Sequence, residues 1–144
     1  MKVEIQQLDS GLPLPEHQHE HDAGCDLHAR VDTEILAGGG RVLVPTGIAV
    51  AIPPGCAALV LPRSGLASQH GITCLNSPGL IDAQYRGEIK VLLINTDPVV
   101  NYSIHRGDRI AQLLITPVAS VEWVVVADLG ETNRGNAGFG STGR

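Results

Sequence analysis

Short apolar runs alternate with turn-forming residues along most of the chain. Six mainly apolar runs are separated by segments rich in Gly, Pro, Asn and Asp, and they cover residues 42–44, 48–52, 57–61, 89–94, 110–115 and 121–126. This rhythm predicts many short strands, as in a β-sandwich or β-barrel. Only residues 64–70 favour a helix, of one or two turns with Ser64 as its cap. The pattern therefore predicts an all-β chain with little helix.

The longest uncharged stretch, residues 42–62, is long enough to imitate a membrane span. Its four prolines and two glycines would break a helix in several places. Residues 52–55, Ile-Pro-Pro-Gly, instead favour a turn between two buried strands. We therefore predict a hairpin here and no contact with a membrane.

Size and composition indicate one domain with an aliphatic core. The chain has 144 residues, of which 43% are hydrophobic and only 3% aromatic. A core of Val, Ile, Leu and Ala favours strands, and this length supports one such core. Residues 131–144 lose the apolar rhythm and are rich in glycine. We predict a single β domain over residues 1–130 and a flexible lid over residues 131–144.

Charge and cysteine content limit the partners and the compartment. A net charge of -5 opposes binding to a nucleic-acid polymer, although a metal ion and a few arginines can still hold a small polyanion. Cys25, Cys56 and Cys74 are odd in number and form no CxxC pair, which argues against a disulfide framework. The first residues carry charges where a secretory signal needs an apolar run. A cytoplasmic protein is expected.

Five segments carry groups that suit phosphate chemistry. Arg63, Ser64 and Gly65 place a guanidinium, a hydroxyl and backbone amides at the predicted helix start. Asp82 and Tyr85 lie three apart in a glycine-bounded turn before a strand, although such residues often serve only the turn and its packing. In chain order the segments are residues 23–29, 62–67, 79–88, 107–113 and 134–143.

In this order and spacing, the five segments resemble the motifs of the trimeric dUTPases, and the resemblance extends from residue 23 to residue 143. It implies a jelly-roll-like β-barrel or sandwich that forms a homotrimer with shared active sites. The segments at Asp26, Arg63 and Gln112 would come from one subunit, the Asp82 segment from a second and the glycine-rich tail from a third. The implied activity is magnesium-dependent hydrolysis of dUTP to dUMP and pyrophosphate.

The resemblance also implies a role for each matching residue. Asp82 would orient and help to deprotonate the water that attacks the alpha-phosphorus in line, and Asp26 would hold Mg²⁺ through coordinated water. Tyr85 would pack under the deoxyribose and exclude a 2'-hydroxyl. Phosphate oxygens would be bound by Arg63, Ser64, Gly65 and Gln112. Uracil would be paired by Asn76 and by the backbone around Gly79, Leu80, Ile81 and Lys90.

The tail would close over the bound nucleotide and exclude water. Arg134 would reach phosphate, Phe139 would stack on uracil, and the amides around Gly140 and Ser141 would wrap the gamma-phosphate. Ala137 stands where the family commonly has glycine, so closure of this lid could be slower or altered.

Two other features have alternative interpretations. His17, His19 and His21 alternate, with Cys25 soon after, so an extended segment could bind zinc or nickel. No second ligand cluster completes a coordination shell, so we predict a solvated loop and no required transition metal.

Trp123 lies in an apolar run without basic neighbours, which favours a core or subunit contact over a stacking platform.

Two rival functions remain open. A dCTP deaminase has the same fold, but those relatives carry a glutamate about where Leu92 stands, and residues 89–94 contain no carboxylate. A non-catalytic trimer that senses dUTP or docks a partner would be expected to lose Asp82 or the tail. Both are present in this sequence.

Overall fold

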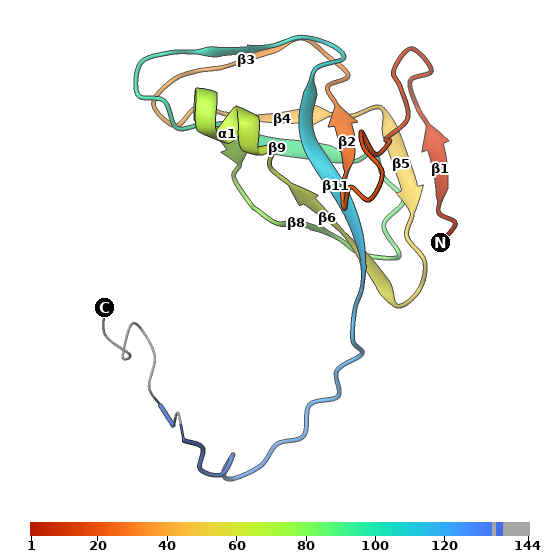
Figure 1. Cartoon of the computed structure of the whole chain (residues 1–144), viewed down its shortest axis with the longest axis vertical. Helices are drawn as coiled ribbons and strands as arrows, with labels where there is room; N and C mark the ends of the chain where they lie inside the picture. The colour runs from red at the N-terminus through yellow and green to blue at the C-terminus, as the bar shows by residue number, and fades with distance from the viewer. Residues whose placement is uncertain (134, 137–144) are drawn as a thin grey trace.

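The computed structural model describes residues 1–133, 135 and 136, in which the chain forms eleven strands and one short helix (Figure 1). The helix is α1 (Ser64–His70). The strands are β1 (Glu4–Gln7), β2 (Cys25–His28), β3 (Thr33–Ile35), β4 (Arg41–Pro45), β5 (Ile48–Ala51), β6 (Cys56–Leu61), β7 (Ile72–Cys74), β8 (Gly79–Ile81), β9 (Lys90–Asn95), β10 (Tyr102–Ile104) and β11 (Arg109–Pro117).

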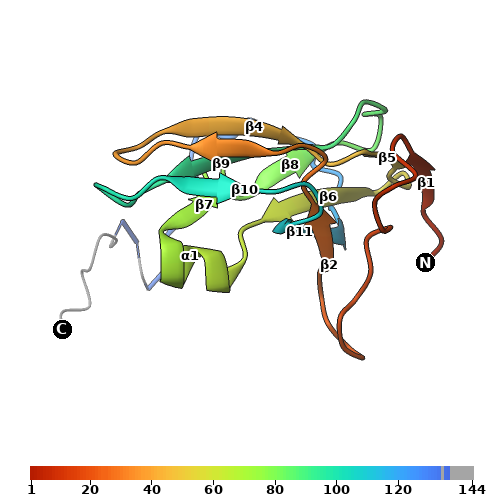
Figure 2. The same cartoon turned by 90° about the horizontal axis from the view of Figure 1, so that it is seen from above.

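The strands form four antiparallel sheets that pack against one another. The largest has the order β2-β11-β6-β8, a second has the order β4-β9-β7, and the pairs β1-β5 and β3-β10 complete the set. Figure 2 shows β4 and β6 in separate layers. The predicted all-β class is therefore confirmed, as a layered arrangement in which the described strands close no barrel.

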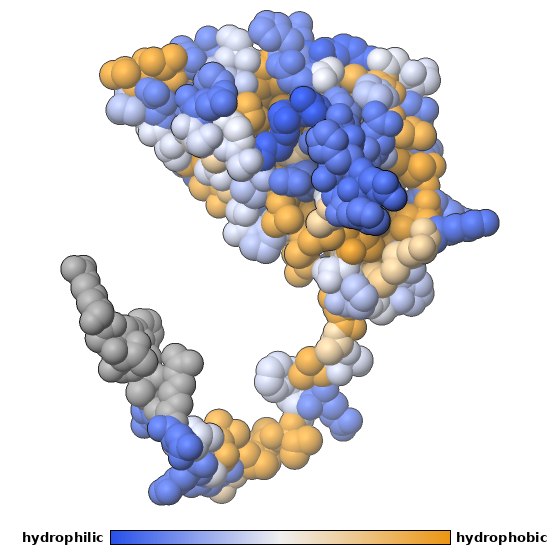
Figure 3. Space-filling model, viewed as in Figure 1, coloured by the Kyte–Doolittle hydropathy of each residue, from blue (hydrophilic) through white to orange (hydrophobic). Residues whose placement is uncertain are grey.

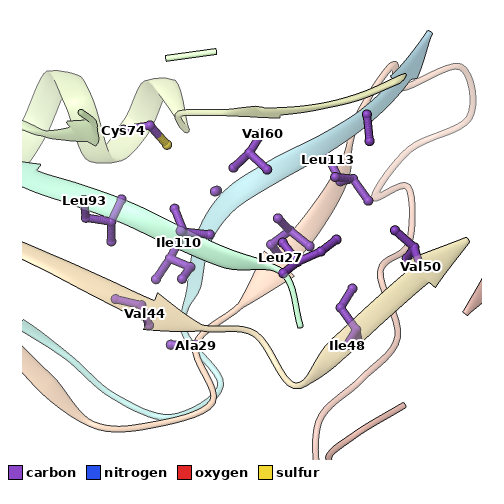
Figure 4. Packing of buried hydrophobic residues seen from close by; sticks show 14 of the residues in the cluster. Leu27, Ala29, Val44, Ile48, Val50, Val60, Cys74, Leu93, Ile110 and Leu113 are labelled. Atoms are coloured by element: carbon purple, nitrogen blue, oxygen red, sulfur yellow. The ribbon is translucent and has the colours of Figure 1, made fainter. Parts of the chain in front are cut away.

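One aliphatic core lies between the sheets. Side chains from all four sheets meet there, and those at its centre are less than 2% exposed (Figure 4). Burial of a side chain of this size stabilises the fold by about 1.5–3 kcal/mol. The largest fully buried aliphatic residues are Leu27, Ile35, Val44, Ile52, Ile72, Ile89, Val91, Leu93, Ile104 and Ile110. The core of Val, Ile, Leu and Ala predicted from the composition is confirmed.

The uncharged stretch of residues 42–62 contributes to β4, β5 and β6, as predicted, but the predicted hairpin is wrong. The turn is present: Cys56 N donates to Pro53 O at 3.1 Å, and Gly55 takes a positive φ of 77°. However, β5 pairs with β1, whereas β6 pairs with β11 and β8. Turn chemistry shows where the chain reverses, but it does not fix which strands then pair. None of the described helices is long and apolar enough to cross a membrane.

The helix has the predicted bounds but not the predicted cap. Arg63 is the N-cap residue, and its side chain makes no capping hydrogen bond, so Ser64 is the first helical residue rather than the cap. At the other end Gly71 takes a φ of 65°, and its N–H donates to Ala67 O at 3.1 Å. This left-handed glycine ends the helix and turns the chain into β7.

After β11 the chain leaves the body of the fold (Figure 1). We call residues 118–133 the C-terminal arm; all of them are exposed and none belongs to a strand. Valine, leucine and tryptophan side chains project from it into solvent, with Val125 97% and Trp123 88% exposed (Figure 3). The predicted strand over residues 121–126 is therefore absent, and Trp123 is not a core residue of its own chain. The predicted division at residue 130 stays a prediction.

Candidate active site

A cluster of three charged side chains lies where β2, α1 and β11 meet. The carboxylate of Asp26 contacts Arg63 Nε at 3.5 Å and accepts a hydrogen bond from Arg109 Nη1 at 3.1 Å. Arg63 Nη1 also donates to Arg109 O at 2.8 Å, which fixes the two arginines relative to each other. With two guanidinium groups and one carboxylate, this arginine–aspartate cluster carries an excess positive charge that suits an anion.

Strand pairing explains why these residues meet. Asp26 on β2 lies opposite Gln112 on β11, and an irregularity between Arg109 and Ala111 shifts the register beside them. Gln112 Nε2 donates to Pro62 O at 3.0 Å, so its side chain lies over the segment that leads into α1. A Cβ at residue 24 would lie 2.7 Å from Gln112 Oε1, so a side chain there would displace the Gln112 amide.

A second group of predicted residues lies on residues 82–88, which we call the Asp82 loop. It joins β8 to β9, and these two strands do not pair with each other, since β8 pairs with β6 and β9 pairs with β4 and β7. Tyr85 N donates to Asp82 O at 3.0 Å, and Tyr85 Oη donates to Glu88 O at 3.0 Å. Arg86 Nη1 donates to the carbonyls of Ala83 and Tyr85 at 2.7 and 2.8 Å. These bonds give the loop a defined shape.

A shallow hollow lies beside the Asp82 loop. Its apolar wall is exposed, with Leu80 66% and Leu43 54% accessible to solvent. A Cβ at Gly79 would lie 3.5 Å from Asn76 Nδ2, which places the Asn76 side chain against β8. The residues that line the hollow are Leu43, Leu80, Ile81, Asp82, Tyr85, Glu88, Ile89 and Lys90. The residues predicted to select the base and sugar thus lie in one neighbourhood.

The two groups of residues are not joined within one chain. No hydrogen bond or ion pair between described residues links the Asp82 loop to the arginine–aspartate cluster. The predicted phosphate-binding residues therefore make no direct polar contact with the loop that carries the predicted catalytic residue. The tail residues Arg134, Ala137, Phe139, Gly140 and Ser141 lie outside the described residues, so their predicted roles stay predictions.

The histidine-rich loop before β2 differs from the extended segment considered above. Residues 18–21 form a bend and a turn, and His19 N donates to Asp22 Oδ2 at 2.9 Å. His17 Nε2 lies 3.5 Å from Cys25 Sγ, but among the described residues no three metal-binding side chains gather. Burial, followed by the charge of Asp26, raises the pKa of Cys25. The predicted lack of a required transition metal stays a prediction.

Three residues with defined contacts near these groups were missed by the sequence analysis. Arg109 belongs to a matched segment, so its charge beside Gln112 was a usable signal. Arg30 and Glu88 form an ion pair at 3.3 Å, which no local pattern indicates because 58 residues separate them. Burial lowers the pKa of His28 beside the cluster, against the opposing effect of Asp26.

The chain is similar to known proteins over almost its whole length. The family model described as dUTPase matches residues 11–143. Proteins named deoxyuridine 5'-triphosphate nucleotidohydrolase share 53% identity in Corynebacterium efficiens, covering 99% of this chain and 78% of the relative, and 56% in Mycobacterium tuberculosis, covering 96% and 93%. Among solved structures, the Staphylococcus bacteriophage 80alpha dUTPase with dUPNHPP is 26% identical, covers 99% of both chains and gives a TM-score of 0.91.

A further solved structure resembles this chain in fold. It is a mutant dUTPase from phage phi11 of S. aureus, described with a coordinated structural Mg(II) ion. It is 24% identical, covers 90% of this chain and 99% of its own, and gives a TM-score of 0.81.

Proposed function

Because the chain belongs to the dUTPase family, we propose that the arginine–aspartate cluster and the Asp82 loop are the two halves of its active site. The enzyme is a hydrolase that converts dUTP to dUMP and pyrophosphate. This activity limits the uracil available for incorporation into DNA and supplies dUMP for dTMP synthesis. The observation that carries the assignment of residues is the positively charged cluster around Asp26, which matches the chemistry of a triphosphate.

The cluster would hold the phosphate chain. Arg63 and Arg109 have 28% and 44% of their side chains exposed, so both can turn toward phosphate oxygens. The first N–H groups of a helix have no partner within it, which leaves the amides of Ser64 and Gly65 available as donors. Gln112 lies on the same surface and would reach the alpha-phosphate. Several such contacts would fix the bent pose that in-line attack requires.

Asp26 fits the chemistry of a magnesium site. Mg²⁺ is commonly held by one or two carboxylates together with substrate phosphates and water, rather than by a cage of protein ligands. Asp26 supplies one carboxylate beside the proposed phosphate site, and among the described residues no three metal-binding side chains gather into a cage. A bound Mg²⁺ ion would neutralise charge on the triphosphate, while Asp26 would hold its coordinated water.

Asp82 would supply the chemical step. Its carboxylate would accept a proton from a water molecule as that water attacks the alpha-phosphorus, and the bond to the pyrophosphate oxygen would break opposite. General-base catalysis of this kind contributes about 10²–10⁴-fold. Leu80, Ile81, Gly79, Asn76 and Lys90 would present the uracil-binding surface of the hollow. A cytosine would meet unmatched donors and acceptors there, which costs binding energy.

We propose that copies of the chain assemble as a homotrimer and share active sites. The lack of a direct polar contact between the two groups among the described residues of one chain supports this, because the Asp82 loop of another copy would then complete each site. The C-terminal arm is a second argument, because it exposes Val121, Trp123 and Val124 at 60%, 88% and 76%. Exposed apolar segments of this kind mark contact surfaces. Trp123 is therefore proposed as a subunit contact.

A cytoplasmic location is part of the proposal. Cys25, Cys56 and Cys74 are all free thiols in the structure, which suits a reducing compartment. The acidic net charge of -5 continues to support a small nucleotide, rather than a nucleic-acid polymer, as the partner.

The activity is tested by incubating the pure protein with dUTP and Mg²⁺ and measuring pyrophosphate and dUMP. Stoichiometric release of both products is expected, with no release in EDTA. Ammonia released from dCTP would indicate the deaminase instead, although β9 carries Leu92 and no acidic residue that could move protons on cytosine. Binding of dUTP without turnover would indicate the sensor.

Gly87→Ala is expected to weaken the selection against ribonucleotides. A Cβ at residue 87 would lie 2.6 Å from Tyr85 Cζ and 3.1 Å from its Cε2, so the tyrosine ring would have to move from its place. We expect the ratio of kcat/KM for dUTP to that for UTP to fall by about tenfold, the range that contacts in a fitted pocket supply. Competition assays with both nucleotides measure this ratio.

Tyr85→Ala serves as the matched comparison for Gly87→Ala. If the glycine acts through the ring, adding Gly87→Ala to Tyr85→Ala should produce no further change. An unchanged ratio in Gly87→Ala would contradict the role of Tyr85 in sugar selection.

A further inference from the structure

Four charged side chains that are distant in sequence form a continuous chain of ion pairs. Arg106 donates from Nη1 and Nη2 to the two carboxylate oxygens of Asp9 at 2.6 and 2.9 Å. Arg30 donates from Nε to Asp9 at 3.3 Å and from Nη1 to Glu88 Oε1 at 3.3 Å. This ionic chain connects the loop before β11, the N-terminal segment and the Asp82 loop.

The two carboxylates of the ionic chain are well shielded from solvent. Only 19% of the Asp9 side chain and 17% of the Glu88 side chain are exposed. The hydrogen bond from Arg106, followed by that from the Gly11 N–H, lowers the pKa of Asp9 to about 2. Asp9 therefore stays charged at neutral pH and holds Arg30 in place. Networked, partly shielded pairs hold their geometry better than isolated surface pairs.

Glu88 is the point at which the Asp82 loop is tied to the rest of the fold. Its Oε1 accepts hydrogen bonds from Gly47 N at 2.8 Å and from Arg30 Nη1 at 3.3 Å. Among the described residues, these are the only hydrogen bonds that leave residues 82–88. The other hydrogen bonds of the loop join its own residues to one another, and Ala83 adds packing against the core.

Two hydrogen bonds within the loop connect Glu88 to Tyr85 and Tyr85 to Asp82. Tyr85 Oη donates to the Glu88 carbonyl, and Tyr85 N donates to the Asp82 carbonyl, both at 3.0 Å. A shift of Glu88 would therefore shift the ring of Tyr85 and the backbone of Asp82. A displacement of about 1 Å in reacting groups can cost as much as 10²-fold in rate.

Taking the proposed role of Asp82 as its premise, we propose that Arg30 is a positioning residue that fixes the Asp82 loop by holding Glu88. Its guanidinium spans the Asp9 and Glu88 carboxylates, so it connects an ion pair anchored by Arg106 to the loop. Arg30 is outside the hollow and outside the arginine–aspartate cluster. Its effect on hydrolysis would therefore pass through the placement of the loop rather than through contact with dUTP.

Steady-state kinetics of Arg30→Met and Glu88→Gln test this role. Both variants are expected to lower kcat for dUTP by about 10- to 100-fold, with KM changed less than about threefold, because the loop is misplaced while the phosphate site is intact. The double variant should lower kcat no further than the worse single variant does, because both substitutions act on the same Arg30–Glu88 ion pair. Arg30→Lys should recover part of kcat, because an ammonium keeps the charge but lacks the planar fork.

Hydrogen exchange gives a second readout that does not depend on turnover. Backbone amides of residues 82–88 are expected to exchange faster in Arg30→Met than in the unaltered protein, while those of β6 and β11 stay unchanged. Arg41→Met is the matched control, because Arg41 is exposed on β4 and forms no ion pair with another described residue. Its kcat and its exchange pattern should equal those of the unaltered protein.

The outcomes separate this inference from the proposed function. If folded Arg30→Met kept normal kcat and normal exchange over residues 82–88, the positioning role would be overturned. A lower melting temperature with unchanged kcat in the folded protein would also overturn it, since stability alone would then depend on the ion pair. If the unaltered protein released no pyrophosphate from dUTP, the proposed function would fail, while the exchange measurement would still report on the loop.

Discussion

Replacing Asp82 with asparagine is expected to lower kcat for dUTP by about 10²–10⁴-fold while KM changes little. The amide keeps the size and hydrogen-bonding capacity of the side chain, but it cannot accept a proton from the attacking water. Binding should persist because the proposed phosphate-binding groups lie in the separate cluster around Asp26. Single-turnover kinetics and calorimetric titration with a non-hydrolysable dUTP analogue measure the chemical step and the affinity separately.

Glu34→Gln provides the matched control for Asp82→Asn. It also converts a carboxylate to an amide, at an exposed position on β3 that forms no ion pair with another described residue. Its kcat should equal that of the unaltered protein. Normal turnover by folded Asp82→Asn would remove Asp82 from the mechanism and with it the assignment of the loop.

Mixing two inactive variants is expected to restore hydrolysis. Arg63→Ala removes a phosphate contact and should lower kcat by about 10²–10³-fold, as loss of a preorganised donor does. When Arg63→Ala and Asp82→Asn subunits are co-assembled in equal amounts, some sites receive Arg63 from one copy and Asp82 from another. With random assembly, a site receives an intact Arg63 from one subunit with a probability of about one half, and an intact Asp82 from another with the same probability. About a quarter of the sites would therefore contain both groups. Pyrophosphate release by the mixed assembly, purified through two different tags, gives the measurement.

A second mixture is the control for complementation. Arg63→Ala combined with Asp26→Asn should stay inactive, because both residues lie in the same cluster of the same chain. Recovery in that mixture would contradict the assignment of both residues to one half-site. No recovery in the first mixture, despite a trimeric mass, would show that each chain builds its site alone.

Strands formed by continuous apolar runs were predicted from the sequence. Most of the strands without such a run were missed. Residues 42–44, 57–61 and 110–115 fall within β4, β6 and β11, and most residues of β6 and β11 are buried or half-buried. Strand β1, by contrast, is exposed along its whole length, and β3 has three residues. Such strands owe their conformation to pairing with a distant partner, which periodicity does not report.

The site was predicted in its parts but not in its arrangement. Asp26, Arg63 and Gln112 were identified from separate motifs, and the structure shows why they meet, since β2 and β11 pair and Gln112 reaches the carbonyl of Pro62. The separation of these groups from Asp82 follows from sheet order. Likewise, the contact of Arg106 with Asp9 crosses 97 residues, so no local pattern could indicate it. The tail residues with predicted roles, Arg134, Phe139, Gly140 and Ser141, lie outside the described residues, and those roles stay predictions.

The exposed C-terminal arm also affects how long a newly synthesised chain persists before it assembles. A valine-rich stretch of high β-propensity that projects into solvent is prone to pair with the wrong chain. An extended backbone without a strand partner is also a preferred place for proteolytic cleavage. We therefore expect chains that have not assembled into the proposed homotrimer to be degraded faster than assembled ones, so that assembled chains predominate in the cell.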